Sequence, residues 1–490
     1  MIAFTAAEIA EITSGRLDAD PGITPLSVVT DSREATQGSL YVAKPGEHAD
    51  GHDFIDAAFA AGAVLALVER PVAGPDGTAR PSIVVADAVL AMGALAAEAV
   101  RRIRAARAEA GSQLTVVGIT GSAGKTTTKD LLAGILATQA TQGNTVAPKG
   151  SYNGEVGVPL TVFRAGNDTR YLVIEMGATG IGHIRYLAEM VKPDIGVVLA
   201  VGTAHAGEFG GVENIALAKG EMVEGLTAGG TAIINLDDER VAAMRSRTHA
   251  TVLGFSAEGR PDAQVQALNA DTNTGGGPEF DLLLPDGAAP RHVSSKLIGA
   301  HHTGNLLAAA AAAWAAGVPG DHIAQSLGNQ AAASRWRMER TERPDGVTII
   351  NDAYNANPES MRAALRTLAD LGRGRRTWAV LGAMLELGND SIREHTAVGT
   401  QVVRLNISRL LVVGREARAL YVSAVQEGSW GDECLFAETL DEAYDVLDAE
   451  LQPGDLVLFK SSNSVGLRHL GDRIALPPAP TPADERSTLL

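Results

Sequence analysis

A glycine-rich stretch between a predicted strand and a predicted helix constrains this chain more than any other feature. It runs from Gly118 to Thr128, with glycines at 118, 121 and 124. Residues 114–117 are apolar and β-branched, which predicts a buried strand, and apolar side chains at 131, 132, 135 and 136 predict one buried helix face. Free backbone N–H groups and the helix dipole point at the same spot in such a junction, so the stretch predicts an anion site.

The residues within this stretch fit a phosphate ligand. Glycine lets the backbone approach phosphate oxygens closely, Lys125 would reach the terminal phosphates, and the Thr126 hydroxyl would bind Mg²⁺. The common spacing requires glycine at 119, where isoleucine stands, so the chemistry fits although the usual pattern fails. A tight turn without a ligand is the alternative, and Lys and Thr running directly into the helix weigh against it. The predicted nucleotide contacts here are Gly121, Ser122, Ala123, Gly124, Lys125, Thr126 and Thr127.

Length and composition exclude several classes of protein. A chain of 490 residues is too long for one hydrophobic core. A net charge of −17 argues against nucleic-acid binding, so an anionic ligand must be held by local basic groups and backbone N–H donors. Cys434 is the only cysteine, which excludes an internal disulfide and suits the cytoplasm. The sequence shows no signal peptide and no apolar run long enough to span a bilayer, so we expect no membrane insertion.

Alternating strand and helix patterns predict an α/β fold with three domains. We expect a small α/β domain at residues 1–108 and a mostly parallel sheet with helices on both faces at 109–325. A Rossmann-like α/β unit is expected at 326–474. Residues 475–490 hold four prolines and no apolar periodicity, which predicts a disordered tail.

Three side chains downstream of the phosphate stretch are candidates to act with it. Glu175 ends an apolar strand and His205 follows the next one, so both are expected at the carboxyl edge of a parallel sheet, where ligands bind. Glu175 could ligate Mg²⁺; the alternatives are a structural acid at Glu175 and a loop histidine without a ligand at His205. Lys219 lies on a predicted helix, and a solvated lysine explains it equally well.

A dense polar cluster follows the strand predicted at residues 347–350. Asn357 is expected to cap a helix that begins at Pro358, which explains that asparagine structurally. Asp352, Tyr354 and Asn355 have no such explanation and are free to contact a ligand.

A second polar cluster lies near the N-terminus. Asp31, Ser32 and Arg33, next to Lys44, could hold a phosphorylated ligand by charge and hydrogen bonding. A solvated turn with an ordinary ion pair explains these residues at least as well.

Together these motifs resemble the Mur ligase family, ATP-dependent amide-forming enzymes of peptidoglycan synthesis. The resemblance covers about residues 5–473. It rests on the glycine spacing at 118, 121 and 124, on residues 219–221 (KGE) and on residues 299–301 (GAH). Residues 352–358 (DAYNANP), residues 381–388 with His395, and residues 50–54 resemble the branch that joins D-alanyl-D-alanine to UDP-N-acetylmuramoyl-tripeptide.

The resemblance implies ATP and Mg²⁺ as cofactors and an acyl-phosphate intermediate. We expect a monomer, although the sequence does not fix the oligomeric state. Lys219 aligns with the family's carbamylated lysine, which holds a second Mg²⁺. The implied catalytic residues are Lys125, Lys219, His205 and Arg337, and the implied metal ligands are Thr126, Glu175, His205 and carbamylated Lys219. Further nucleotide contacts are Asn305, Asn351 and Asp352. The implied substrate contacts are Asp31, Ser32, Arg33 and Lys44 for the uridine diphosphate, and Asn153, Tyr354, Asn355 and Asn357.

Three positions depart from the family pattern. His302 stands where the family commonly has Asn, Asn463 where this branch often has Arg, and Gly154 where a second Asn is frequent. These departures affect the adenine contact, the anchor for a peptide end and one asparagine contact, respectively.

Three other functions remain as alternatives. A sister ligase that adds a single amino acid is disfavoured by residues 355–358, and a polyglutamate-adding ligase by the N-terminal Asp31-Ser32-Arg33 domain. A non-catalytic nucleotide-binding subunit is disfavoured by the complete set of Lys125, Thr126, Glu175, His205 and Lys219.

Overall fold

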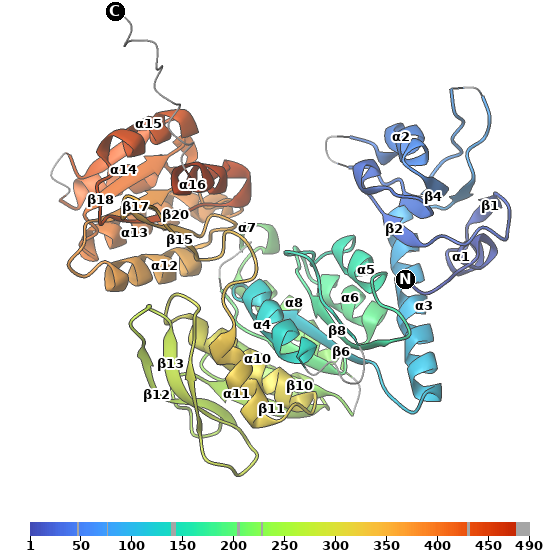
Figure 1. The fold of residues 1–490 in the computed structure, drawn as a ribbon, viewed down its shortest axis with the longest axis horizontal. Helices are drawn as coiled ribbons and strands as arrows, with labels where there is room; N and C mark the ends of the chain where they lie inside the picture. Colours follow the sequence, from blue (N-terminus) through green and yellow to red (C-terminus); the bar gives the residue numbers. More distant parts are fainter. Residues whose placement is uncertain are drawn as a thin grey trace, which may run out of the picture.

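Three sheets, one in each of three successive parts of the chain, make up the molecule. The computed structural model describes residues 1–46, 49–75, 77–138, 144–202, 206–226, 229–428 and 432–476. The sheets form three lobes, coloured blue, cyan to yellow, and orange to red along the chain (Figure 1). The α/β prediction is therefore confirmed. The expected boundaries after residues 108 and 325 stay predictions. His205 and residues 477–490 of the expected tail lie outside the described residues.

The N-terminal lobe contains a five-stranded sheet. Its spatial order is β1-β5-β4-β3-β2, with β1 antiparallel to β5 and the other neighbours parallel. Thr5 and Glu8 form a capping box at the start of α1, and Asp87 caps α3. The elements are α1 (Ala6–Ile12), β1 (Arg16–Asp18), β2 (Ser27–Val29), β3 (Ser39–Val42), α2 (Ile55–Ala60), β4 (Ala63–Val68), β5 (Ser82–Val84) and α3 (Ala88–Glu109).

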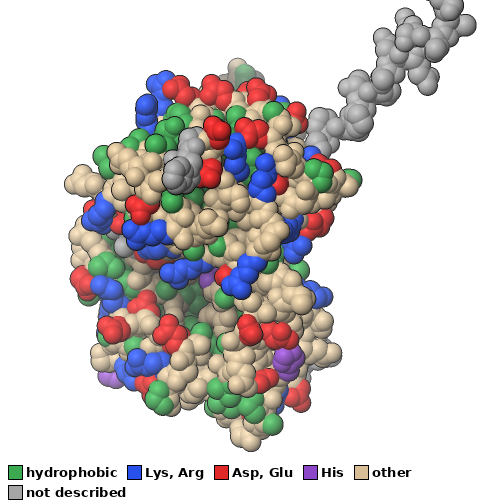
Figure 2. Space-filling view, turned by 90° about the vertical axis from the view of Figure 1, so that its left-hand side faces the viewer, with side chains coloured by type: hydrophobic (Ala, Val, Ile, Leu, Met, Phe, Trp, Pro, Cys, Tyr) green, Lys and Arg blue, Asp and Glu red, His purple; other side chains and the backbone are tan. Residues whose placement is uncertain are grey.

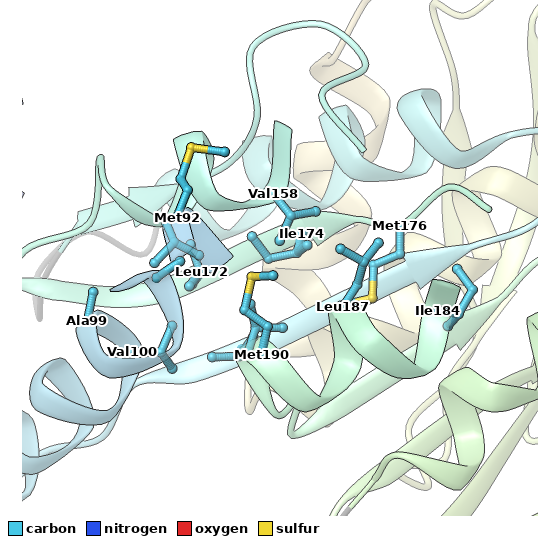
Figure 3. Close-up of a cluster of buried hydrophobic side chains, with 14 of the residues drawn as sticks. Met92, Ala99, Val100, Val158, Leu172, Ile174, Met176, Ile184, Leu187 and Met190 are labelled. Carbon is cyan, nitrogen blue, oxygen red and sulfur yellow. The ribbon is translucent and has the colours of Figure 1, made fainter. Parts of the chain in front are cut away.

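The long helix α3 fixes this lobe to the central one. Met92, Ala99 and Val100 of α3 meet apolar side chains from the central lobe, among them Leu172 and Met190 (Figure 3). All five side chains are buried. Removing this apolar surface from water stabilises the contact, so α3 links the two lobes rather than serving as a free spacer.

The central lobe contains a nine-stranded sheet. Its order is β14-β13-β12-β11-β10-β9-β6-β8-β7. All strands from β6 to β12 run parallel, and β13 and β14 form an antiparallel edge. The strands are β6 (Thr115–Thr120), β7 (Asn144–Val146), β8 (Thr169–Glu175), β9 (Ile195–Val198), β10 (Thr231–Asn235), β11 (Thr251–Ser256), β12 (Val265–Thr272), β13 (Pro278–Leu283) and β14 (Arg291–Ser294).

Helices cover both faces of the central sheet, as predicted. Alternate residues of β6 point to opposite faces, so Val117 and Ile119 pack on α4 and α10, whereas Val116 packs with α3 and α5. The alanine-rich α10 has buried side chains from Leu306 to Ala313 because it lies flat on the sheet. The helices are α4 (Lys125–Ala137), α5 (Gly157–Val162), α6 (His183–Val191), α7 (Ala206–Phe209), α8 (Val212–Glu224), α9 (Glu239–Ala243), α10 (His302–Ala315) and α11 (Gly320–Asn329).

The C-terminal lobe contains a six-stranded sheet of order β15-β16-β20-β17-β18-β19. Only the β15–β16 pair is antiparallel among these described strands. Helices α12 to α14 pack on one face and α15 and α16 on the other. The elements are β15 (Glu339–Glu342), β16 (Thr348–Asn351), α12 (Pro358–Leu371), β17 (Thr377–Leu381), α13 (Ser391–Arg404), β18 (Arg409–Val413), α14 (Arg418–Gln426), β19 (Cys434–Ala437), α15 (Leu440–Glu450), β20 (Leu456–Lys460) and α16 (Leu467–Ala475).

The central and C-terminal lobes touch directly. Ser334, in the segment that joins them, donates to Asp130 of α4 at 2.6 Å. Gly207 of α7 lies so close to Gly388 that an added Cβ would meet the Gly388 nitrogen at 2.8 Å. Within the described part of the chain, no helix is long and apolar enough to cross a membrane.

Candidate active site

The phosphate stretch forms the predicted strand–turn–helix junction. β6 ends at Thr120 and α4 begins at Lys125. Gly124 has φ +82°, and an added Cβ would lie 2.2 Å from Asn305 Oδ1, so no side chain fits there. Lys125 Nζ donates to the Gly121 carbonyl at 2.7 Å. Burial lowers the pKa of Lys125, against the opposing influence of Glu175. The turn therefore presents backbone donors and one cation to the same place.

Four side chains beside the turn form a continuous hydrogen-bond chain. Arg337 Nη2 donates to Thr126 Oγ1 at 3.2 Å, and Thr126 Oγ1 lies 3.2 Å from Ser151 Oγ. Ser151 Oγ then donates to Glu175 Oε1 at 2.7 Å. Asn153 Nδ2 also donates to Glu175 Oε1, at 2.9 Å. The chain links the phosphate loop, the end of β8 and the C-terminal lobe.

Glu175 has one oxygen without a donor. The residue is fully buried, and its Oε2 has no hydrogen-bond partner among the described residues. A buried carboxylate oxygen left without a partner is costly. No group of three or more His, Cys, Asp or Glu in the described part of the chain could hold a metal by itself. Mg²⁺ needs only one or two protein oxygens when phosphates and waters complete its shell, so Glu175 and Thr126 fit it.

Lys219 lies on α8 and faces the same cleft. It is 4% exposed, and no described residue accepts a hydrogen bond from its side-chain nitrogen or forms an ion pair with it. Burial, and then the nearby charge of Lys125, hold the pKa of Lys219 well below its usual value. The solvated alternative for this lysine is therefore wrong. A lower pKa favours the neutral amine, which is the form that can act as a nucleophile.

Arg337 brings the C-terminal lobe to the phosphate loop. Its guanidinium carbon lies 4.4 Å from the centre of the Tyr354 ring, a cation–π distance. Its Nε is buried without a partner among the described residues. The arginine thus retains a donor that no described group uses.

Asp352 and Lys460 form a buried ion pair beside this arginine. Lys460 is 2% exposed; its Nζ lies 2.5 Å from Asp352 Oδ2 and donates to Asn355 O at 3.1 Å. Asp352 Oδ1 accepts from the Met338 backbone at 3.1 Å. Asp352 therefore stabilises the surrounding structure as well as lining the cleft.

Asn357 caps α12, as predicted. Its side chain accepts from the Ser360 backbone at 2.8 Å, and Pro358 occupies the first helical position. Its Nδ2 also lies 3.5 Å from Ser122 O, across the lobes.

One cleft of about 690 Å³ gathers most of the predicted residues. Figure 2 shows one face of the molecule, where Lys and Arg side chains lie across the middle despite the net negative charge. The predicted residues that line the cleft are Gly121, Ser122, Ala123, Gly124, Lys125, Thr126, Thr127, Asn153, Glu175, Lys219, Asn305, Arg337, Asp352, Tyr354, Asn355 and Asn357.

The remaining predicted residues lie elsewhere. Asn351 does not line this cleft; its Nδ2 donates to Arg468 O at 2.9 Å and lies 3.2 Å from Asp472 Oδ1. Its role as a nucleotide contact stays a prediction. His205 lies outside the described residues, so its assignment as a metal ligand stays a prediction too.

The N-terminal cluster contains the ion pair that the simpler alternative requires. Arg33 Nη2 lies 2.6 Å from Asp31 Oδ2, and Arg33 holds the pKa of Asp31 at about 2. Asp31, Ser32, Arg33 and Lys44 do not line the cleft. Both interpretations of this cluster remain open, because an exposed arginine in an ion pair could still bind phosphate.

Sequence reasoning missed two residues of the site. Ser151 sits between Thr126 and Glu175, and Lys460 pairs with Asp352. Ser151 lies in a turn without a periodic pattern, and the lysine ends an apolar strand, so neither gave a local signal. His302, which departs from the family pattern, is buried, and its Nδ1 lies 3.0 Å from Asn305 Nδ2. Its pKa is well below the usual value because of burial, so a neutral ring stands at this position.

Comparison with known proteins decides the family. Residues 27–114 match the model described as Mur ligase family, catalytic domain, and residues 119–313 match the Mur ligase middle domain. Residues 336–463 match the Mur ligase, glutamate ligase domain. A Mycobacterium tuberculosis protein, UDP-N-acetylmuramoyl-tripeptide--D-alanyl-D-alanine ligase, is 43% identical, covering 97% of this chain and 98% of its own. The chain belongs to the Mur ligase family. It is thus an ATP-dependent ligase, and the sequence-based expectation is confirmed.

Other relatives of this Mur ligase agree. The Escherichia coli protein of the same name is 35% identical, covering 86% of this chain and 88% of its own. A crystal structure of MurF from Acinetobacter baumannii superposes with a TM-score of 0.83 at 30% identity, covering 97% and 99% of the two chains. MurF from Thermotoga maritima, solved in complex with ADP, gives a TM-score of 0.75 at 26% identity, covering 92% and 97%.

Proposed function

We propose that this Mur ligase joins D-alanyl-D-alanine to UDP-N-acetylmuramoyl-tripeptide, giving the pentapeptide, ADP and phosphate. One observation carries the proposal: the phosphate loop and Arg337 of the C-terminal lobe meet in one cleft. They do so in a chain that matches ligases of that name along almost its whole length.

Forming an amide from a carboxylate at neutral pH requires an activated carboxylate. The tripeptide carboxylate attacks the γ-phosphorus of ATP, the bond to ADP breaks, and an acyl phosphate forms. The amine of D-alanyl-D-alanine then attacks the carbonyl carbon, loses a proton, and phosphate leaves. Negative charge builds first on the phosphoryl oxygens and then on the carbonyl oxygen, so positioning and electrostatic stabilisation dominate.

Three groups of this chain are placed to stabilise that negative charge. Lys125 and the backbone N–H groups at the start of α4 lie at the phosphate loop. Arg337 reaches the same loop from the other lobe and retains its Nε donor. Both cations are held by protein contacts before the substrate arrives, which lowers the cost of reorganisation.

Glu175, Thr126 and His205 are proposed to hold Mg²⁺, with a second ion at carbamylated Lys219. A bound Mg²⁺ neutralises phosphate charge and orients the reacting groups. For the carbamate, the neutral Lys219 amine forms a bond to the carbon of CO₂ and releases a proton. The result is an anion at a lysine that is otherwise unpaired among the described residues, and the depressed pKa of Lys219 favours the step.

The remaining site assignments are proposals of the same kind. Asn305, Asn351 and Asp352 are assigned to the nucleotide, and Asp31, Ser32, Arg33 and Lys44 to the uridine diphosphate on the N-terminal lobe. Asn153, Tyr354, Asn355 and Asn357 are assigned to substrate binding. Action as a monomer in the cytoplasm stays a prediction, supported for the compartment by the single cysteine.

Phosphate release with a panel of acceptors tests the function. The purified chain, ATP and Mg²⁺ are combined with each UDP-muramoyl peptide, with and without D-alanyl-D-alanine. Phosphate release is expected only with the tripeptide and the dipeptide together. Release with a shorter UDP-muramoyl peptide and a single amino acid would favour the sister ligase. Absence of ADP under every condition would favour the non-catalytic alternative.

A further inference from the structure

Arg337 lies between two residues with unusual backbone conformations. Trp336 has φ +58° and Met338 has φ +52°, both in the left-handed region that side chains other than glycine disfavour. Each such residue is strained and persists only where surrounding contacts enforce its conformation. Separate contacts at Trp336 and at Met338 enforce these two backbone conformations.

The indole of Trp336 is held by α16. Its Nε1 donates to the Asp472 carboxylate, at 3.0 Å from both oxygens. Asp472 also accepts from Arg335 at 2.9 Å, and the guanidinium groups of Arg335 and Arg468 lie 4.8 and 5.3 Å from the indole centre. The ring is therefore fixed by a carboxylate that accepts from its N–H and by two guanidinium groups over the ring.

The backbone of Trp336 connects directly to the group beneath Arg337. Tyr354 N donates to Trp336 O at 3.3 Å, and Trp336 N donates to Glu339 Oε2 at 2.8 Å. The Tyr354 ring is the surface on which the Arg337 guanidinium lies. A shift of Trp336 would therefore move the arginine and its supporting ring together.

On the other side, Met338 N donates to Asp352 Oδ1, and Asp352 pairs with the buried Lys460. The arginine thus lies on a short segment anchored at both ends. One anchor, Asp352, lines the cleft, whereas Asp472 and Trp336 do not.

We propose that Trp336 and Asp472 are positioning residues for Arg337. Their hydrogen bond holds the segment in its strained conformation so that the guanidinium reaches Thr126 and the phosphate loop. The inference rests on the proposed function, because it assigns a purpose to the placement of Arg337. It also gives α16, the last described helix, a role in phosphoryl transfer without any contact to the ligands.

Two substitutions test the inference. Trp336→Phe removes the indole donor and keeps an aromatic ring next to the two arginines. Asp472→Asn keeps the shape of the side chain and one acceptor oxygen, but it removes the negative charge and replaces the other oxygen by an amide nitrogen, which cannot accept. We expect kcat for phosphate release to fall about 10- to 100-fold, because small misplacements of a charged group are costly. KM for ATP should change little, since the phosphate loop is untouched.

Arg473→Gln is the matched control. Arg473 is the neighbour of Asp472 on α16 and pairs with the exposed Asp441 at 3.0 Å, away from Trp336. The kcat of Arg473→Gln should equal that of the wild type. Thermal unfolding of all three variants shows whether they fold.

A double-mutant cycle separates positioning from a general structural effect. If Trp336 acts through Arg337, then Trp336→Phe lowers kcat in the wild-type background but not in Arg337→Ala. Wild-type kcat in both Trp336→Phe and Asp472→Asn would overturn the inference, as would an equal loss in the two backgrounds. In both cases wild-type phosphate release would leave the proposed function standing. A wild-type chain that never releases phosphate would overturn the function and the inference together.

Discussion

Ser151 offers the sharpest test of the proposed metal site. Its hydroxyl donates to Glu175 Oε1 at 2.7 Å and lies 3.2 Å from Thr126 Oγ1, so it contacts two of the proposed protein ligands of Mg²⁺. Ser151→Ala removes both bonds and leaves the Glu175 carboxylate held by Asn153 alone among its described donors. The side chains that should bind the cation would then be free to reorient.

The size of the effect follows from this geometry. Losing an outer partner of a metal ligand costs about 10- to 100-fold in metal affinity. That range corresponds to about 1.4–2.7 kcal/mol. It matches the loss of one hydrogen bond to a charged group, at about 1.5–3 kcal/mol. The two arguments agree, so a shift of at least tenfold is expected.

Titrating Mg²⁺ in the phosphate-release assay measures this loss of metal affinity. The concentration of Mg²⁺ that gives half-maximal rate should rise about 10- to 100-fold in Ser151→Ala, with much of the rate recovered at saturating Mg²⁺. Ser151→Thr keeps the hydroxyl and should retain a near wild-type requirement. An unchanged magnesium requirement in Ser151→Ala would refute the assignment of Glu175 and Thr126 to the metal.

Three further predictions concern single residues. Lys125→Ala should lower kcat about 10²- to 10³-fold, as for loss of one charge-stabilising donor; near-normal turnover would contradict its role. Lys219→Ala should lose activity and be partly restored by small carboxylates such as acetate, and absence of any rescue would weigh against a negative charge there. His395 is buried, accepts from Met384 N and donates to Ser391 O, and burial lowers its pKa. Below about pH 6.5 the unfolded state therefore binds the extra proton, and stability should fall as the pH drops toward the folded-state pKa of His395. Thermal unfolding of His395→Gln should depend less on pH across this window than the wild type; identical profiles would argue against the histidine.

Local signals explain what could be predicted about the fold. The strand–turn–helix at Lys125, the capping box at Thr5 and the cap at Asn357 are each fixed by neighbours within a few residues. The strands at residues 114–117 and 347–350, and the strand that ends at Glu175, were predicted from apolar, β-branched runs, because parallel strands are buried on both faces. The short strands β1, β2 and β3 of the first sheet were not predicted. Their few residues give too little periodicity to stand out from a loop.

Long-range contacts explain what could not be predicted about the site. Asp352 was expected to be free for ligand, yet it pairs with Lys460, 108 residues later. Asn351, its neighbour on β16, points instead to α16. Ser151 gave no signal at all. In each case the partner comes from a distant segment, so no window of sequence contains both groups.

The sequence by itself determined the phosphate-binding junction, the α/β class and the family, because each depends on residue type and short spacing. Only the tertiary structure decided that Lys219 is buried and unpaired among the described residues, and that Arg337 reaches Thr126 across two lobes. The physical reason is that burial and charge are properties of the space around a side chain. That space is built by elements from three sheets, which meet only when the chain has folded.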